Sequence, residues 1–163
     1  MTCKERVEAY LREQRVPFES QHHRVAFTAQ EVAASEHLPG DLIAKVVMVF
    51  ADADMVMLVL PASHRANLSK VAAELGVINV WLADEHEFSE IFRDCEIGAM
   101  PPFGNLYGVP VYVDRTLAED EVIVFQAGTH SDTISMRYAD YARLVQPVVV
   151  DIVRDVHALA GRF

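Results

Sequence analysis

The chain is poor in cysteine, in positive charge and in long hydrophobic runs. Its 163 residues contain two cysteines, Cys3 and Cys95, which are too few for a disulfide framework or a cysteine zinc site. We therefore expect the cytosol as its compartment, and Cys95 as an unbonded structural thiol more than as a nucleophile. No apolar run reaches the length of a membrane span, and the first five residues begin a charged helix instead of a signal peptide.

Positive charge is also scarce, with 14 Lys and Arg against 24 Asp and Glu and a net charge of −10. A broad basic face is the usual mark of a non-specific nucleic-acid binder, so the composition argues against such a protein and against a DNA partner. It leaves room for a protein that touches only the end of an RNA through a local patch. The candidates for that patch are Arg24, Lys45, Arg65 and Lys70, and the alternative is that they are scattered solvated charges.

Common catalytic signatures are missing as well. The seven histidines form no His-x-x-x-His pair on a clear helix, and no dense cluster of carboxylates and histidines occurs. Gly-x-Ser-x-Gly and glycine-rich phosphate-loop motifs are absent. We therefore predict no metal and no cofactor.

What the chain does have is apolar content of 52%, enough for a real core in one domain spanning 1–163. Capping residues and periodicity predict interspersed helices and strands without a regular βαβ rhythm, which indicates an α+β fold with a mixed, strongly curved sheet. The tail over 147–163 is either a short strand plus helix or a C-terminal extension. Helices are expected over 3–14, 28–36, 68–75, 84–90 and 137–144, and strands over 18–23, 43–50, 55–60, 77–82, 109–113, 121–126 and 133–136.

Lys45 lies inside the apolar run 42–50, which has the character of a buried strand. An unpaired buried charge costs several kcal/mol, so this ammonium group must reach water, a partner or a cavity. The alternative is an edge-strand lysine that limits aggregation or extends to solvent.

Two later segments could share a site with Lys45. The loop Gly98–Gly104 combines flanking glycines with Pro101 and Pro102, so its backbone can approach a ligand closely and aim N–H groups at a developing oxyanion. The turn Gly128–His130 could present an imidazole. For both segments, a plain connection between strands is the alternative.

Taken together, these segments resemble the free-standing aminoacyl-tRNA deacylases of the YbaK and prolyl-tRNA-synthetase-associated editing domain family. The resemblance covers nearly everything from Phe27 to Leu144. It is carried by the order and spacing of Thr28–Ala33, Ala44–Val47, Leu60–Arg65, Gly98–Gly104, Val113–Asp114 and Ala127–His130.

The family resemblance implies a barrel-like mixed sheet flanked by helices, and hydrolysis of the ester on a mischarged tRNA, usually tRNA(Pro) carrying a small amino acid. It places a strand lysine at Lys45, a Gly-x-x-x-Pro loop at Gly98–Pro102 and a pocket-bordering turn at His130. One departure concerns specificity, because some alanine-clearing relatives have asparagine where this chain has Val46. Gly98 and His130 join Lys45 as predicted catalytic residues, and the predicted substrate-binding residues are Phe27, Val46, Met100, Pro101, Pro102, Gly128 and Thr129.

The mechanism we expect is attack by water on the ester, with Lys45 holding the terminal adenosine or polarising the carbonyl. The pocket wall is predicted from Phe27, Val46, Met48 and Met100, with ordinary core packing as the alternative for each. The expected partner is the acceptor end of a mischarged tRNA, bound by a monomer or homodimer, with no membrane. Two other functions stay open: an inactive tRNA- or protein-binding homologue, and a hydrolase of small esters or amides.

Overall fold

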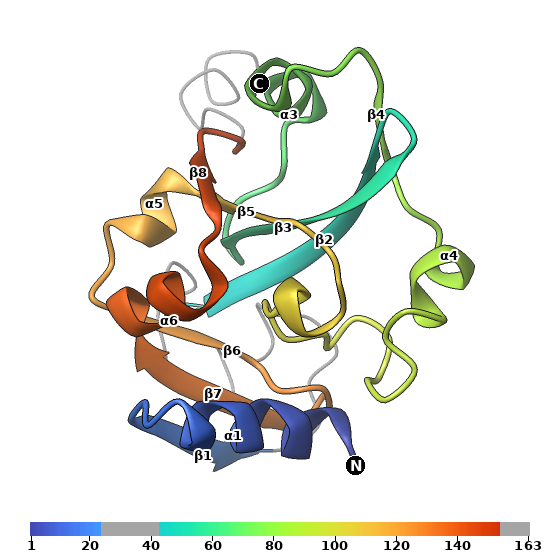
Figure 1. Cartoon of the computed structure of the whole chain (residues 1–163). Helices are drawn as coiled ribbons and strands as arrows, with labels where there is room; N and C mark the ends of the chain where they lie inside the picture. Colours follow the sequence, from blue (N-terminus) through green and yellow to red (C-terminus); the bar gives the residue numbers. More distant parts are fainter. Residues whose placement is uncertain (24–42, 154–163) are drawn as a thin grey trace.

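The computed structural model describes residues 1–23 and 43–153 (Figure 1). Phe27, Arg24 and the expected helix 28–36 lie outside these ranges. The helices are α1 (Cys3–Glu13), α3 (Leu68–Leu75), α4 (Glu85–Ser89), α5 (Arg115–Ala118) and α6 (Tyr138–Val145), with a 3-10 turn η2 (Gly104–Leu106). The strands are β1 (Phe18–His22), β2 (Ile43–Ala51), β3 (Asp54–Pro61), β4 (Val80–Leu82), β5 (Val111–Asp114), β6 (Val122–Gln126), β7 (Asp132–Arg137) and β8 (Val148–Val150).

These strands form one mixed sheet, in the order β1-β7-β6-β2-β3-β5-β8, with β4 paired to β2 off this path. The pairs β2·β6, β3·β5 and β5·β8 are parallel, and the others are antiparallel. The predicted mixed sheet flanked by helices is confirmed. The sheet is not closed into a barrel, because β1 and β8 stand at opposite ends of the path.

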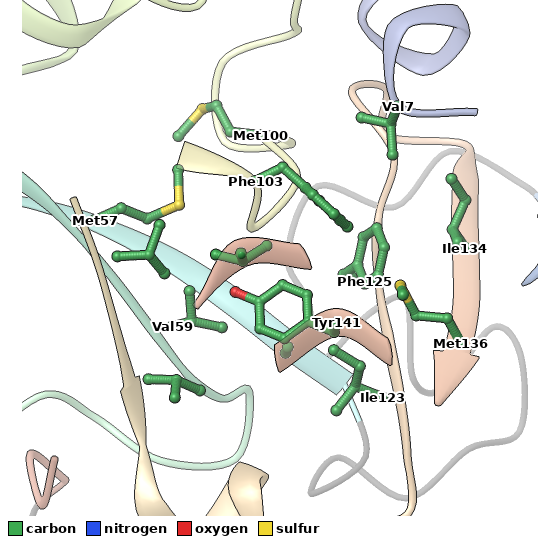
Figure 2. Close-up of a cluster of buried hydrophobic side chains, with 14 of the residues drawn as sticks. Val7, Met57, Val59, Met100, Phe103, Ile123, Phe125, Ile134, Met136 and Tyr141 are labelled. Atoms are coloured by element: carbon green, nitrogen blue, oxygen red, sulfur yellow. The ribbon is translucent and has the colours of Figure 1, made fainter. Parts of the chain in front are cut away.

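The β2–β3 hairpin separates two hydrophobic clusters, because successive side chains of a strand point to opposite faces. One cluster contains Met48 and Met57 and receives α1 and α6, as Figure 2 shows for Val7 and Tyr141. The other cluster, around Val49, Leu58 and Leu60, packs against Val71 of α3. The alternation along the hairpin therefore decides which layer each residue of β2 joins.

Local capping explains most helix boundaries. The Thr2 side chain accepts from the Glu5 N–H at the start of α1, and Asn67 accepts from the N–H groups of Ser69 and Lys70 at the start of α3. Gly76 ends α3 at a φ of +68°, which a glycine adopts at little cost. The sequence missed α5, a four-residue helix capped by Asp114, which is too short for periodicity to reveal.

The segment after Pro147 packs on the sheet as far as the structure describes it. β8 extends the sheet beside β5, and Ile152 is fully buried. The backbone N–H of Ile152 donates to the Asp114 carboxylate at 2.9 Å. This supports the short-strand interpretation of the tail up to residue 153.

The two cysteines correct an expectation. Cys3 and Cys95 form a disulfide across 92 residues of sequence, so Cys95 is not an unbonded thiol. The first turn of α1 lies against the loop before Gly98, where the Cys3 N–H donates to the Asp94 carbonyl at 3.1 Å. A low cysteine count argues against a framework of several bridges, but it does not speak to one bridge made by tertiary contact.

Candidate functional site

Lys45, the central residue of the predicted site, lies where β2 and β6 diverge. Among the described residues, these parallel strands pair at Ile43 with Val124 and at Ala44 with Phe125, and farther along β2 the partner is β4. Lys45 is the first residue of β2 beyond the paired part, and Gln126 occupies the same place on β6. The ends of the two strands thus separate directly after Ala44.

Lys45 lies opposite Leu60 on the face of β2 that also carries Val47 and Val49. The side chain is half-buried, and no ion pair or hydrogen bond joins it to a residue in the described ranges. Burial, and secondarily the charge of Arg65, lower the pKa of Lys45 below its usual value. An ammonium group held in this way has unused capacity for an anion or a carbonyl oxygen.

Arg65 reaches this neighbourhood through the turn that follows β3. The His64 N–H donates to the Pro61 carbonyl at 3.0 Å, and the Ala62 N–H donates to the Ile43 carbonyl at 2.8 Å. These bonds fold the turn back against the beginning of β2. Two cations of the predicted basic patch are therefore neighbours, whereas Lys70 pairs with Asp151 at 3.3 Å.

The residues expected to wall the amino-acid pocket lie mostly in the core. Val46 is on the opposite face of β2 from Lys45 and packs against the cluster that contains Met48 and Met100. Met48 is 4% exposed and Met100 is 6% exposed. For these three residues the geometry favours the core-packing alternative.

The two prolines of the loop Gly98–Gly104 pack in the protein interior. Pro101 and Pro102 are buried, and the Pro102 carbonyl accepts from the Tyr141 hydroxyl at 2.7 Å. Tyr141 is itself fully buried, and this burial raises the pKa of its hydroxyl well above the usual value, with the nearby Tyr138 as a second cause. The prolines thus anchor the loop in the core and leave Gly98 exposed.

The structure brings the Gly98 loop and the Gly128–His130 turn together, as the sequence predicted. The Gly128 N–H donates to the Ala99 carbonyl at 2.8 Å, and the Glu96 N–H donates to the Gly128 carbonyl at 2.8 Å. Gly98 has φ +85° and Gly128 has φ +92°, values that favour glycine. Because Gly128 lies two residues beyond Gln126, this contact places the loop at the divergence of β2 and β6.

His130 adds two further hydrogen bonds between the turn and the segment before Gly98. Its backbone N–H donates to Glu96 Oε1 at 2.9 Å, and its Nε2 lies 2.8 Å from the Ile97 carbonyl oxygen. A carbonyl only accepts, so Nε2 carries a proton and donates it in this bond. The geometry makes His130 a residue that positions the loop.

Only some backbone N–H groups of the loop can serve an oxyanion. Pro101 and Pro102 have none, and the Ala99 N–H donates to the Glu96 carbonyl at 3.0 Å. Within the described residues, no hydrogen bond uses the N–H of Gly98 or of Met100. Because Gly104, whose N–H is also unused among the described residues, is buried at the start of η2, Gly98 and Met100 are the candidate donors for a ligand.

The Thr129 side chain bonds to a carboxylate that sequence reasoning missed. Its hydroxyl donates to Asp132 at 2.6 Å, and the same carboxylate bonds to His22 at 3.0 Å and pairs with Lys4 at 3.4 Å. Burial raises the pKa of Asp132, but its bonds to Thr129, His22 and Lys4 outweigh burial, so the pKa lies below the usual value. Asp132 ties the turn to β1 and α1.

Comparison with solved structures identifies the class of fold. The crystal structure of a hypothetical protein, APE2540, matches with a TM-score of 0.83 at 21% identity, over 92% of this chain and 100% of that chain. A proposed trans-editing enzyme for prolyl tRNA synthetase matches with a TM-score of 0.81 at 19% identity, over 95% and 99% of the two chains. These likenesses show that the chain has the fold of those proteins.

Comparison by sequence is more specific. The family model of the aminoacyl-tRNA editing domain matches residues 23–144, and the chain belongs to this family. The multifunctional Ser/Thr-tRNA deacylase ProXp-y of Escherichia coli (strain K12) is 35% identical over 101 residues, and the same protein of Escherichia coli O157:H7 matches equally. The match spans 61% of this chain and 59% of the relative. Among the described residues, no helix is both long and apolar enough to cross a bilayer.

Proposed function

We propose that this protein hydrolyses the ester bond of a mischarged aminoacyl-tRNA. Two observations support the proposal: the hydrogen-bonded contact between the Gly98 loop and the Gly128–His130 turn, and the half-buried Lys45 at the point where β2 leaves its pairing with β6. Membership of the editing-domain family supports it. A cytosolic location and a monomeric or dimeric state remain predictions from the sequence.

The amino acid we propose is small. The name of the Escherichia coli relative points to serine and threonine, whereas the resemblance noted in the sequence points to tRNA(Pro) as the carrier. A hydrolytic pocket separates side chains that differ by one methylene by only about 1–3 kcal/mol, so it works best by excluding larger side chains. We therefore expect activity on seryl, threonyl or alanyl esters and none on a bulkier, correctly matched amino acid.

The chemistry needs placement and charge stabilisation, because aminoacyl esters are already reactive. Water attacks the ester carbonyl, and the tetrahedral oxyanion accepts from the N–H groups of Gly98 and Met100. The Lys45 ammonium group binds the phosphate or sugar of the terminal adenosine, and the ribose oxygen leaves with a proton. His130 keeps the loop in register through its bond to Ile97.

The test is a deacylation panel of tRNAs, including tRNA(Pro), charged with serine, threonine, alanine or cysteine. Removing one oxyanion donor or one substrate-holding charge typically lowers the rate by about 10²–10³-fold, and we expect that loss for Lys45→Ala. Lys70→Ala is the matched control, because Lys70 is a cation already paired with Asp151. Turnover by Lys45→Ala equal to that of the unaltered protein would remove Lys45 from the mechanism.

The same panel decides between an enzyme and an inactive homologue. If the unaltered protein binds charged tRNA but accelerates the hydrolysis of none, the binding-module alternative holds. If free aminoacyl esters are cleaved as fast as the tRNA-linked ones, a small-ester hydrolase is favoured.

A further inference from the structure

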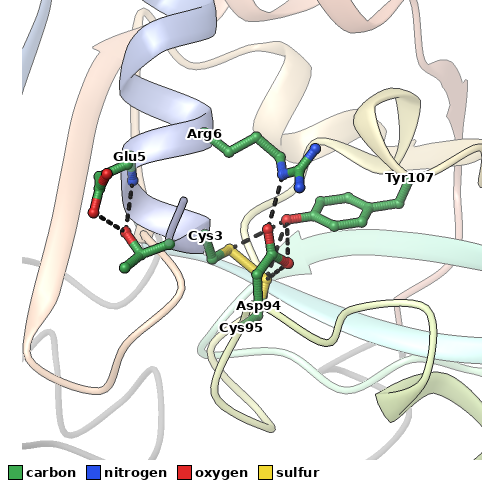
Figure 3. The surroundings of a disulfide bond; sticks show 7 residues. Cys3, Glu5, Arg6, Asp94, Cys95 and Tyr107 are labelled. Carbon is green, nitrogen blue, oxygen red and sulfur yellow. Dashed lines mark hydrogen bonds and ion pairs between the residues drawn. A yellow bond between two sulfur atoms is a disulfide. The ribbon is translucent and has the colours of Figure 1, made fainter.

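The disulfide joins two parts of the molecule that meet at the proposed site. Cys3 is in the first turn of α1, and Cys95 immediately precedes the segment that carries Glu96, Ile97 and Gly98. Figure 3 shows the bridge between the helix and this loop. The Cys3 N–H also donates to the Asp94 carbonyl at 3.1 Å, so one hydrogen bond accompanies the covalent link.

Cys3 also lies directly under the turn that contacts the loop. A Cβ atom added to Gly128 would be 2.5 Å from Cys3 Cβ and 2.6 Å from Cys3 Sγ, so only glycine lets the turn lie this close. One bridge thus touches Gly128 through Cys3 and continues into Glu96 through Cys95. It supports both partners of the hydrogen-bonded contact on which the proposed site depends.

Polar groups around the bridge can contact the two cysteines both as a disulfide and as two thiols. The Tyr107 hydroxyl lies 3.4 Å from each sulfur and donates to Asp94 at 3.0 Å. The same carboxylate is held by Arg6 at 2.8 Å, as Figure 3 shows. When the sulfur–sulfur bond opens, the hydroxyl and the carboxylate lie close enough to hydrogen-bond the two thiols.

Of the two cysteines of the bridge, Cys95 is the more accessible to solvent. Cys3 is 1% exposed, whereas Cys95 is half-buried at the edge of the loop. An incoming thiolate therefore reaches Cys95 Sγ, and Cys3 is the sulfur that leaves.

We propose that Cys3 and Cys95 form a reversible thiol-modification site, which takes a dithiol reductant and controls the Gly98 loop. A thiolate of the reductant attacks Cys95 Sγ, the sulfur–sulfur bond breaks, and Cys3 leaves as a thiolate that takes up a proton. The second thiol of the reductant then displaces Cys95, so two electrons pass to the protein and the reductant becomes a disulfide. The dithiol form releases the loop from α1, and the disulfide form holds it against the Gly128–His130 turn.

The proposal reaches activity only through the proposed function, so its main measurement is independent of turnover. Hydrogen exchange is followed in the full chain, oxidised or treated with dithiothreitol, with free thiols counted in each sample. We expect faster exchange after reduction in residues 94–100 and 127–131. Exchange should be unchanged in α3, which lies at the opposite end of the molecule from α1 (Figure 1). The double variant Cys3→Ser, Cys95→Ser should exchange like the reduced protein with or without reductant.

Deacylation is measured on the same samples as a second readout. A misplacement of catalytic groups by about 1 Å can lower a rate by about 10²-fold. We therefore expect reduction to slow turnover at least tenfold, and the double variant to have the same turnover rate with and without reductant. If exchange in 94–100 is the same in both states, or if the air-oxidised protein titrates with two free thiols, the proposal is overturned. A redox-dependent exchange pattern in a protein that deacylates nothing would support this proposal and reject the proposed function.

Discussion

At the scale of single residues, the ammonium group of Lys45 combines a proposed role with a cost in stability. It is half-buried, and no ion pair with another described residue compensates the loss of water. We expect Lys45→Met, which keeps the length of the side chain, to abolish deacylation while raising the melting temperature by about 2–4 °C, the equivalent of about 1 kcal/mol in a chain of this size. Thermal unfolding measures the change in melting temperature, and the tRNA panel measures the loss of deacylation. A lower melting temperature would show that Lys45 has a stabilising partner.

The pH dependence of the reaction follows from the same side chain. Burial and the charge of Arg65 both lower the pKa of Lys45, so a step that needs the ammonium form is lost at a lower pH than an ordinary lysine would impose. Arg65→Ala removes the second cause, and the alkaline limb of the rate profile should move to higher pH. Rates between about pH 7 and 10, corrected for spontaneous ester hydrolysis, test this.

Arg93→Ala is the control for that experiment. Arg93 is exposed and lies 4.0 Å from the Glu90 carboxylate, and it should leave the alkaline limb where it is. A limb that moves to lower pH in Arg65→Ala would contradict the assignment of the limb to Lys45.

Two glycines that look alike in the sequence should respond differently to alanine. Gly128 and Gly76 both have positive φ, +92° and +68°, but a Cβ at Gly128 meets Cys3 at 2.5 Å and a Cβ at Gly76 meets nothing within 4 Å. We expect Gly76→Ala to lower the free energy of unfolding by about 1–2 kcal/mol through backbone strain alone. Gly128→Ala adds overpacking, typically about 1–3 kcal/mol more. Urea unfolding of both variants measures the difference, and equal losses would show that the turn can move away from Cys3.

At the scale of elements, the sequence predicted what is decided locally. Thr2 and Asn67 cap helices at the expected residues, and Gly76 ends one. Partners distant in the sequence were not predictable from periodicity, and the bridge between Cys3 and Cys95 is the plainest example. The missed helix α5 had a local signal, since Asp114 and Thr116 have the spacing of a cap, but its four residues are too few to show a period.

Asp114 joins three elements, and its removal should affect all of them. The fully buried carboxylate accepts from the Thr116 N–H at 3.1 Å and from the Ile152 N–H at 2.9 Å. Asp114→Ala leaves both donors without a partner, and each buried unsatisfied group costs about 1–3 kcal/mol. We expect a loss of about 2–6 kcal/mol in the free energy of unfolding and faster hydrogen exchange in β8.

Asn67→Ala is the comparison for Asp114→Ala. It removes the cap of α3, where the side chain accepts from two N–H groups near the surface, and should cost about 1 kcal/mol. A loss at Asp114 as small as that at Asn67 would mean that water replaces the carboxylate.

At the scale of the whole molecule, the site depends on contacts that no single segment contains. The residue types of the loop and the turn were predictable as ligand-binding candidates. The end of the β2–β6 pairing after Ala44, which separates Lys45 from Gln126, is a property of the sheet. The alternation along β2 also separates Lys45 from Val46, so adjacent residues of one motif belong to different layers. The sequence motif alone could not show that Val46 faces the core.

Net charge leads to the last prediction, which concerns the proposed binding of tRNA. With a net charge of −10, a favourable phosphate contact must come from a local group of cations, and Lys45 with Arg65 is the group that the proposed site offers. Each neutralised phosphate of a single strand contributes about −0.7 to the slope of log affinity against log salt, so two contacts give about −1.4. Arg65→Ala should make the slope shallower by about 0.7 and lower the affinity for all tRNAs by the same factor, because a phosphate contact carries no sequence information.

Binding titrations at several salt concentrations measure the slope, with Arg93→Ala as the charge-matched control. A slope near −5 would require a broad basic surface, and the proposed contact at the terminal nucleotide would then explain only a small part of the affinity.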